Sequence, residues 1–170
     1  MSDDPLFSFP REVNEVSARL VATGVVIMTV LALTFDLRWL TLVLAYGFVA
    51  RVLSGPRLSP LGQLVTRVVT PALPFAPRLV PGPPKRFAQL IGAVFTVAAA
   101  VLTYGIDRFD LAQTLLAVLL VPASLEAFVG FCTGCWLFGL LMRVGVIPEK
   151  ICESCNDIWK RQPQSADLSA

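Results

Sequence analysis

The sequence has 170 residues, of which 55% are hydrophobic and only 15% are charged, and its mean hydropathy is +0.71. A soluble domain carries about 25% charged residues, so this composition excludes an ordinary soluble globular protein and indicates that lipid is the solvent. The formal net charge of +2 is too small to indicate a nucleic-acid-binding protein.

Four long apolar segments are predicted to cross the membrane. In chain order they cover residues 16–35, 37–53, 87–104 and 111–142. A transmembrane helix needs about 20 apolar residues, and the first and third segments meet this requirement plainly. The second is short, but it follows a tight polar break and is predicted to return across the membrane as the second half of a hairpin. We therefore predict an all-α integral membrane protein with four transmembrane helices.

The segment between the second and third spans has a structure of its own. Ser59 and Pro60 form a helix start signal, a capping hydroxyl followed by proline at the first helical position. Apolar residues at helical spacing follow, which predicts a short amphipathic helix over residues 60–70 on the membrane surface. A helix that packs on the end of the bundle is the alternative. The prolines that follow, up to Pro84, predict an extended chain before the third span.

The fourth segment is too long for one straight span. At 1.5 Å per residue it would extend about 48 Å, whereas the hydrocarbon core is about 30 Å thick, and the tilt needed exceeds the usual range. We therefore expect it to overhang, bend or break, at Pro122 or in the stretch 130–134. Small residues on the third helix, among them Ala88 and Gly92, are expected to pack against Gly130 and Gly134 of the fourth.

The distribution of cations predicts the orientation. Twelve of the fourteen Lys and Arg residues fall on one side of the predicted spans, and only Arg38 and Arg108 fall on the other. The positive-inside rule then places both termini and the long middle loop in the cytoplasm. Residues 1–159 are predicted to form a single membrane domain, and residues 160–170 a disordered tail.

All four cysteines occur in two Cys-x-x-Cys pairs, Cys132 with Cys135 and Cys152 with Cys155. The chain has no histidine, no phosphate-binding glycine loop and no nucleophile elbow, so these thiols are the main candidates for chemistry. The predicted orientation places both pairs at the cytoplasmic end, where the reducing compartment makes a permanent structural disulfide unexpected. Cysteines in such pairs handle metal or electrons.

Two chemistries stay open for the cysteines. The 16 residues between the pairs fall in the range of four-cysteine zinc sites, so Cys132, Cys135, Cys152 and Cys155 together could hold one zinc ion. Alternatively, each pair closes into a disulfide or exchanges with the other, and a soluble thioredoxin-like protein or sulfurtransferase is the expected partner. A third hypothesis gives the two helix cysteines only a packing role.

Charged residues at the same end are the other candidates. Glu126 lies in an apolar helix, where a carboxylate usually faces a partner or a cavity, and it is expected either to pair with Arg51, Lys85 or Arg86 or to stay protonated. It is six residues from Cys132, about 240° around a helix, so the two share a face only if the helix breaks between them. A basic group is expected to meet lipid headgroups or to bind a small anion, which makes an anion carrier the third functional hypothesis; it comprises Arg51, Arg57, Arg67, Lys85 and Arg86.

Several segments resemble a known bacterial membrane family. They are Ser54-Gly-Pro-Arg-Leu-Ser-Pro60, Pro81-Gly-Pro-Pro-Lys-Arg-Phe-Ala-Gln89, Glu126-Ala-Phe-Val-Gly-Phe-Cys-Thr-Gly-Cys-Trp-Leu-Phe138 and the region from Gly145 to Trp159. Together they resemble the family called domain of unknown function 4395, from about Phe9 to Trp159. The resemblance implies a multi-pass protein of the bacterial inner membrane and no particular activity. The architecture is also broadly similar to four-helix membrane proteins of the DoxX and MauE type, which are linked to thiol redox or sulfur chemistry.

Overall fold

The structure of the chain is a computed structural model that describes residues 12–74 and 78–148. Its elements follow in chain order as β1 (Glu12–Asn14), α1 (Glu15–Thr34), α2 (Trp39–Ser54), the 3-10 turn η1 (Gly55–Arg57), α3 (Pro60–Leu64), the π-helical turn η2 (Val65–Val69), α4 (Thr70–Ala72), β2 (Leu79–Pro81), α5 (Gly82–Tyr104), α6 (Phe109–Ser124), the π-helical turn η3 (Leu125–Val129) and α7 (Thr133–Arg143).

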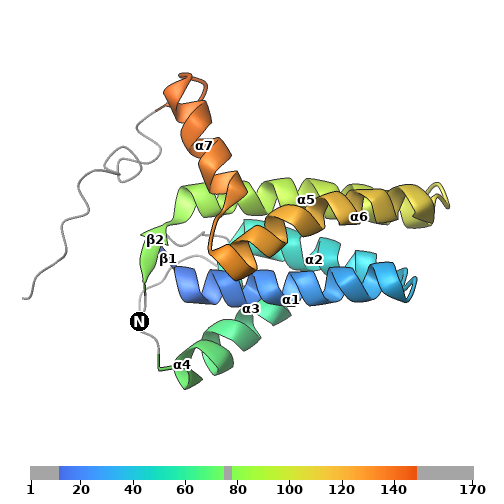
Figure 1. The fold of residues 1–170 in the computed structure, drawn as a ribbon, viewed down its shortest axis with the longest axis horizontal. Helices are drawn as coiled ribbons and strands as arrows, with labels where there is room; N and C mark the ends of the chain where they lie inside the picture. The colour runs from blue at the N-terminus through green and yellow to red at the C-terminus, as the bar shows by residue number, and fades with distance from the viewer. Residues whose placement is uncertain (1–11, 75–77, 149–170) are drawn as a thin grey trace, which may run out of the picture.

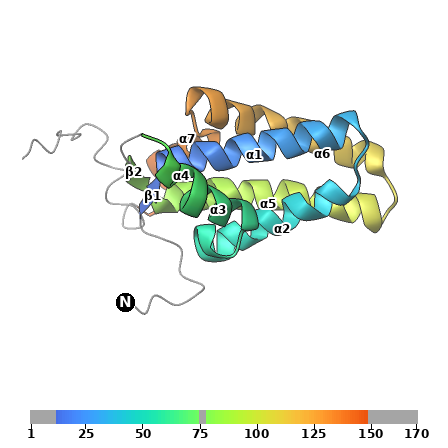
Figure 2. The ribbon, with the colours of Figure 1, turned by 90° about the horizontal axis from the view of Figure 1, so that it is seen from below.

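Helices α1, α2, α5 and α6 lie side by side as a four-helix bundle (Figure 1, Figure 2). Four helical segments are long and apolar enough to cross a membrane, namely Glu15–Thr34, Trp39–Ala72, Gly82–Tyr104 and Phe109–Val129. Many of their large apolar side chains are exposed on the outside of the bundle, as expected where lipid rather than water surrounds a protein. The prediction of an all-α, four-span membrane protein is confirmed.

Small residues allow the helices to approach closely. Ala32, Ala99 and Ala112 are fully buried between them. A Cβ atom at Gly134 would collide with Ala88 of α5, so this predicted contact between the third and fourth segments is present. Gly92, however, packs under the ring of Phe48 on α2, because the third span has α2 as well as α6 for a neighbour.

The third span begins five residues earlier than predicted. Helix α5 starts at Gly82, and Pro83 and Pro84 occupy its first turn, where a missing N–H costs no hydrogen bond. The prediction that these two prolines are extended is therefore wrong. The extended part is β2, which pairs antiparallel with β1 in the register Val13↔Val80. This two-stranded ribbon joins the start of α1 to the start of α5.

The predicted surface helix is present and leaves the bundle at the same end as the ribbon (Figure 1). It runs from Pro60 through α3, η2 and α4 to Ala72, two residues beyond the predicted end. The Ser59 hydroxyl accepts a hydrogen bond from the Gly62 amide at 3.3 Å, as the start signal predicts. Leu61 packs against Gly24 of α1, while Leu64 and Val68 are exposed.

The long fourth segment breaks, so the predicted span 111–142 divides in two. Helix α6 continues through Pro122 into η3 and ends at Gly130, whose φ of +76° lies in the left-handed region that favours glycine. Cys132 is extended, and α7 then leaves at a steep angle to the bundle (Figure 1). The break, rather than an overhang, brings the first cysteine pair to the end of the bundle.

Candidate dithiol site

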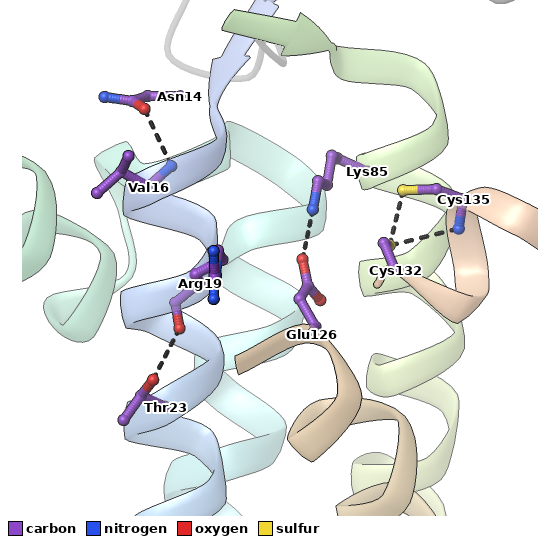
Figure 3. Close-up of polar contacts among 8 residues, drawn as sticks. All are labelled: Asn14, Val16, Arg19, Thr23, Lys85, Glu126, Cys132 and Cys135. Atoms are coloured by element: carbon purple, nitrogen blue, oxygen red, sulfur yellow. Dashed lines mark hydrogen bonds and ion pairs between the residues drawn. The ribbon is translucent and has the colours of Figure 1, made fainter. Parts of the chain in front are cut away.

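Cys132 caps the N-terminus of α7. Its Sγ accepts a hydrogen bond from the backbone N–H of Cys135 at 3.3 Å, in the position where serine or aspartate usually caps a helix. The Cys135 thiol lies one turn above it and donates a second hydrogen bond to the same sulfur, with 2.7 Å between the two Sγ atoms. Figure 3 shows both contacts. The helix start therefore holds two free thiols together.

The two sulfur atoms lie closer together than two ligands of one zinc ion would. Two thiolates on one tetrahedral zinc ion lie roughly 3.8 Å apart, because each Zn–S bond is about 2.3 Å long. The 2.7 Å separation is shorter than that and closer to the about 2.05 Å of a disulfide bond. In the part of the chain that the structure describes, no group of three or more metal-ligating side chains occurs. Cys132 and Cys135 are therefore two close thiols without a third metal-ligating side chain among the described residues.

The two thiols have opposite acidities. The hydrogen bond donated by the Cys135 thiol lowers the pKa of Cys132, and the charge of Lys85 and the amide of Cys135 act in the same direction. Burial and the charge of Glu126 oppose this lowering. The pKa of Cys135 is raised, first because its thiol is the donor in that hydrogen bond and then because it is buried. Cys132 is therefore the more acidic thiol of the pair.

A buried ion pair lies beside the thiols. Lys85, in the first turn of α5, approaches the Glu126 carboxylate of η3 to 2.5 Å, and their side chains are 9% and 20% exposed. Figure 3 shows the two side chains pointing toward one another next to the cysteines. The break at Gly130 explains why Glu126 lies near the cysteines. In a continuous helix, Glu126 and Cys132 would be separated by about 240° around the axis. Lys85 interacts electrostatically with the carboxylate and with both cysteines.

Arg19 of α1 supports the break. Its guanidinium donates hydrogen bonds to the carbonyl oxygens of Phe128 at 3.0 Å and Ala127 at 3.5 Å. These carbonyls end the fourth span and have no partner within their own helix. A cation at a helix C-terminus also complements the helix dipole. Arg19 therefore stabilises the backbone that precedes Cys132.

A cavity of about 720 Å³ opens beside this group, lined by residues of α1, α2, α5, α6 and α7. Cys132, Lys85, Glu126 and Arg51 all contribute to its wall. Arg51 is only 3% exposed, and its guanidinium lies 4.4 Å from the centroid of the Phe48 ring. Within the described part of the chain this guanidinium forms no hydrogen bond and no ion pair.

Two further polar atoms in the cavity wall have no partner among the described residues. They are Oε1 of Gln89 and Oγ1 of Thr133, and both atoms are buried. A buried polar atom without a hydrogen bond costs about 1–3 kcal/mol, so such groups usually have a partner such as water or a ligand. Together with Arg51 they make one end of the cavity polar.

The predicted basic group does not form one surface. Arg51 and Lys85 are buried in the cavity wall, whereas Arg67 is exposed on η2. Arg86 is exposed and donates from Nε to the carbonyl of Val52 at 3.0 Å. The carbonyl of Arg57 accepts a hydrogen bond from Gln63. The structure thus separates the two buried cations Arg51 and Lys85 from the exposed Arg67 and Arg86, while Arg57 is partly buried.

Some predictions fall outside the described residues. They concern Cys152 and Cys155, which supply two of the four ligands in the zinc hypothesis, and the predicted tail over residues 160–170.

The sequence-based prediction missed three side chains at the site, namely Arg19, Gln89 and Thr133. Arg19 and Gln89 carried the signal that identified Glu126, a charged or amide group within an apolar helix. Thr133 had no comparable signal, since its position depends on the break.

Comparisons with known proteins identify the family of the chain but no individual relative. Residues 13–143 match the family described as "Domain of unknown function (DUF4395)". Neither the curated proteins nor the solved structures include a match to the chain.

Proposed function

The chain belongs to the family described as Domain of unknown function (DUF4395), and we propose that it works as a membrane-embedded thiol–disulfide oxidoreductase. The observation that carries this proposal is the pair of sulfur atoms at the start of α7, 2.7 Å apart and hydrogen-bonded to each other. A cysteine at a helix N-terminus in a Cys-x-x-Cys pair has the environment that populates a thiolate at neutral pH.

The reaction is a pair of exchange steps with a disulfide of a soluble partner. The Cys132 thiolate attacks one sulfur of that disulfide, the partner's S–S bond breaks, and a mixed disulfide forms while one partner thiolate leaves. Cys135 then loses its proton and attacks Cys132, so that an internal disulfide forms and the second partner thiol is released. The partner is reduced by two electrons and the pair is oxidised. Run in reverse, the same steps oxidise the partner.

The proposed partner is a thioredoxin-like protein or a sulfurtransferase in the bacterial cytoplasm. Supporting this location, Arg38 and Arg108 occupy the turns at the far end of the bundle, opposite the dithiol end and most of the other cations. In this proposal Cys152 and Cys155 can also exchange with the pair on α7, through a mixed disulfide.

Trapping of the mixed disulfide tests the proposal. In a Cys135→Ser variant, Cys132 can attack the partner but cannot be released, so a covalent adduct that disappears on reduction is expected on non-reducing gels. The matched Cys132→Ser variant lacks the nucleophile and should give little adduct. If no cysteine changes its redox state in cells under oxidant or sulfur stress, and neither variant traps a partner, the proposal is wrong.

The zinc hypothesis makes a different prediction for the same purified sample. A four-cysteine site would contain about one zinc ion per chain and would protect all four thiols from alkylation until a chelator is added. The redox proposal expects a sample without stoichiometric zinc, whose thiols react freely after reduction.

A further inference from the structure

We infer that the cavity beside Cys132 binds a lipid-soluble quinone, which accepts the electrons of the Cys132–Cys135 pair. This inference rests on the proposed function and adds the electron acceptor to it. It follows from the volume of the cavity, the residues of its wall that lie on the outer surface, and its polar end next to Cys132.

The cavity suits an amphipathic molecule with a ring. Its volume of about 720 Å³ falls in the range of about 300–1,000 Å³ typical of small-molecule sites. Arg51, Lys85 and Cys132 form its polar end, while Val25 and Phe95 line it deeper in the bundle. A small inorganic anion would leave that apolar part uncovered. A polar ring at the thiols with an apolar chain between the helices would fill both parts.

Part of the cavity wall lies on the apolar outer surface of the molecule. Three apolar residues of its wall are also exposed on the outside of the molecule, with exposed fractions of 51% for Val118, 62% for Val121 and 59% for Trp136. The two valines belong to the span Phe109–Val129 and Trp136 to the first turn of α7. The two valines lie in a candidate membrane span, so lipid is expected to cover this side of the wall, and we infer that a molecule dissolved in the membrane enters there.

The polar end carries the groups that a quinone and its reduced form require. A quinone offers two carbonyl acceptors, and Arg51 has donors that no described residue uses. Reduction places negative charge on these oxygens, which a buried cation stabilises. Hydroquinone offers O–H donors, for which Oε1 of Gln89 and Oγ1 of Thr133 are unpartnered acceptors. The same wall therefore serves both redox states.

The electrons and protons balance. Counted from the fully protonated dithiol, the S–H bonds of Cys132 and Cys135 break and one S–S bond forms between their sulfur atoms, which releases two electrons and two protons; the Cys132 proton leaves first, when its thiolate forms. The quinone takes up both electrons and both protons and becomes hydroquinone, with one O–H group in place of each carbonyl. A second exchange with the soluble partner then returns the pair to the dithiol.

The test uses the full chain in nanodiscs of synthetic phospholipid, with the thiols reduced beforehand. The probe is decylubiquinone, a fully substituted benzoquinone that offers no free ring position for addition of a thiol. Its reduction is followed by absorbance, and loss of protein thiols is counted in parallel. We expect one quinone to be reduced for each pair of thiols lost, with a rate that saturates as quinone is added.

Three variants locate the reaction. Ala18→Phe fills the cavity from α1, and Arg51→Gln removes the buried cation from its wall; each should slow quinone reduction by about tenfold or more, the effect of losing one good contact. Ala117→Phe places the same ring on the exposed side of α6, outside the cavity, and should leave the rate unchanged. Ala18→Phe keeps the test valid if Arg51→Gln fails to fold.

Failure of the inference differs from failure of the proposed function. Thiol exchange with a glutathione redox buffer, measured without quinone, tests the dithiol alone. Normal exchange without quinone reduction overturns the quinone site only, and so does quinone reduction that proceeds equally in all three variants. A phospholipid that co-purifies in the cavity and that decylubiquinone does not displace also overturns it. Absence of exchange with glutathione overturns the proposed function itself.

Discussion

At the scale of single residues, Cys132 and Cys135 carry the same side chain but differ in acidity because of their positions at the start of α7. Cys132 receives hydrogen bonds from the amide and the thiol of Cys135, which favour its thiolate, while Cys135 keeps its proton because its thiol is the donor in that contact. The neighbouring Lys85 and Glu126 act in opposite directions on the pKa of Cys132, the lysine lowering it and the carboxylate raising it. The sequence identifies these four residues as candidates, but it does not show that they interact.

The opposed charges predict opposite changes in the pH dependence of Cys132. Replacement Glu126→Gln removes the carboxylate, so the pKa of Cys132 should fall and its alkylation by iodoacetamide should reach half its maximal rate at a lower pH. Replacement Lys85→Gln removes the cation, so the same midpoint should move to higher pH. Alkylation rates measured from pH 5 to 10, spanning the usual cysteine value of about 8.5, check both.

The control for this experiment is Asp110→Asn, at the far end of the bundle, which should leave the midpoint where it is. Midpoints that move in the same direction in the Glu126 and Lys85 variants would contradict the electrostatic account of the site.

At the scale of elements, the break over residues 130–132 determines the site. Gly130 supplies the left-handed backbone, Arg19 binds the carbonyls that end the preceding helix, and Gly134 lets α7 lie against Ala88. The length of the apolar segment predicts that something must interrupt it, and this is confirmed. The length of the segment does not show where the break occurs. Pro122 is an equally good candidate from the sequence, and yet the helix continues through it.

Two glycines of α7 provide a matched pair of substitutions. Gly134→Ala places a methyl group against the backbone of Ala88, so we expect it to destabilise the protein by about 1–3 kcal/mol and to slow alkylation of Cys132. At Gly139 nothing lies within 4 Å of the added carbon, so Gly139→Ala should be neutral or stabilising by up to about 1 kcal/mol. Denaturant unfolding in detergent measures both, and equal effects would show that α7 does not depend on the contact with Ala88.

At the scale of the whole molecule, the two ends of the bundle differ in chemistry. One end carries the ribbon, the helix from Pro60 to Ala72, the thiols and the cavity, whereas the other consists of two short turns. Those turns hold Arg38 and Arg108, which pair with Asp107 and Asp110 on exposed surface. The uneven distribution of cations predicts that the thiol end faces the cytoplasm.

Reporter fusions check this orientation. Green fluorescent protein after residue 170 should fluoresce, because it folds in the cytoplasm, and alkaline phosphatase inserted at Asp107 should be active, because it requires export. Phosphatase activity at the C-terminus together with silence at Asp107 would reverse the predicted orientation and would place the dithiol in an oxidising compartment.

The sequence by itself determines the solvent, the number and order of the spans and the residue types available for chemistry. These properties depend on hydrophobicity and charge summed over local segments, and such sums need no knowledge of neighbours. Only the tertiary structure decides that Cys132, Lys85, Glu126 and Arg51 surround one cavity, because they come from α7, α5, η3 and α2 and meet through packing between distant segments. A continuous fourth helix would have turned Glu126 away from Cys132. Gly130, with its positive φ, ends that helix and brings Glu126 and Cys132 together. Contacts from α1 and α5 hold the break in place.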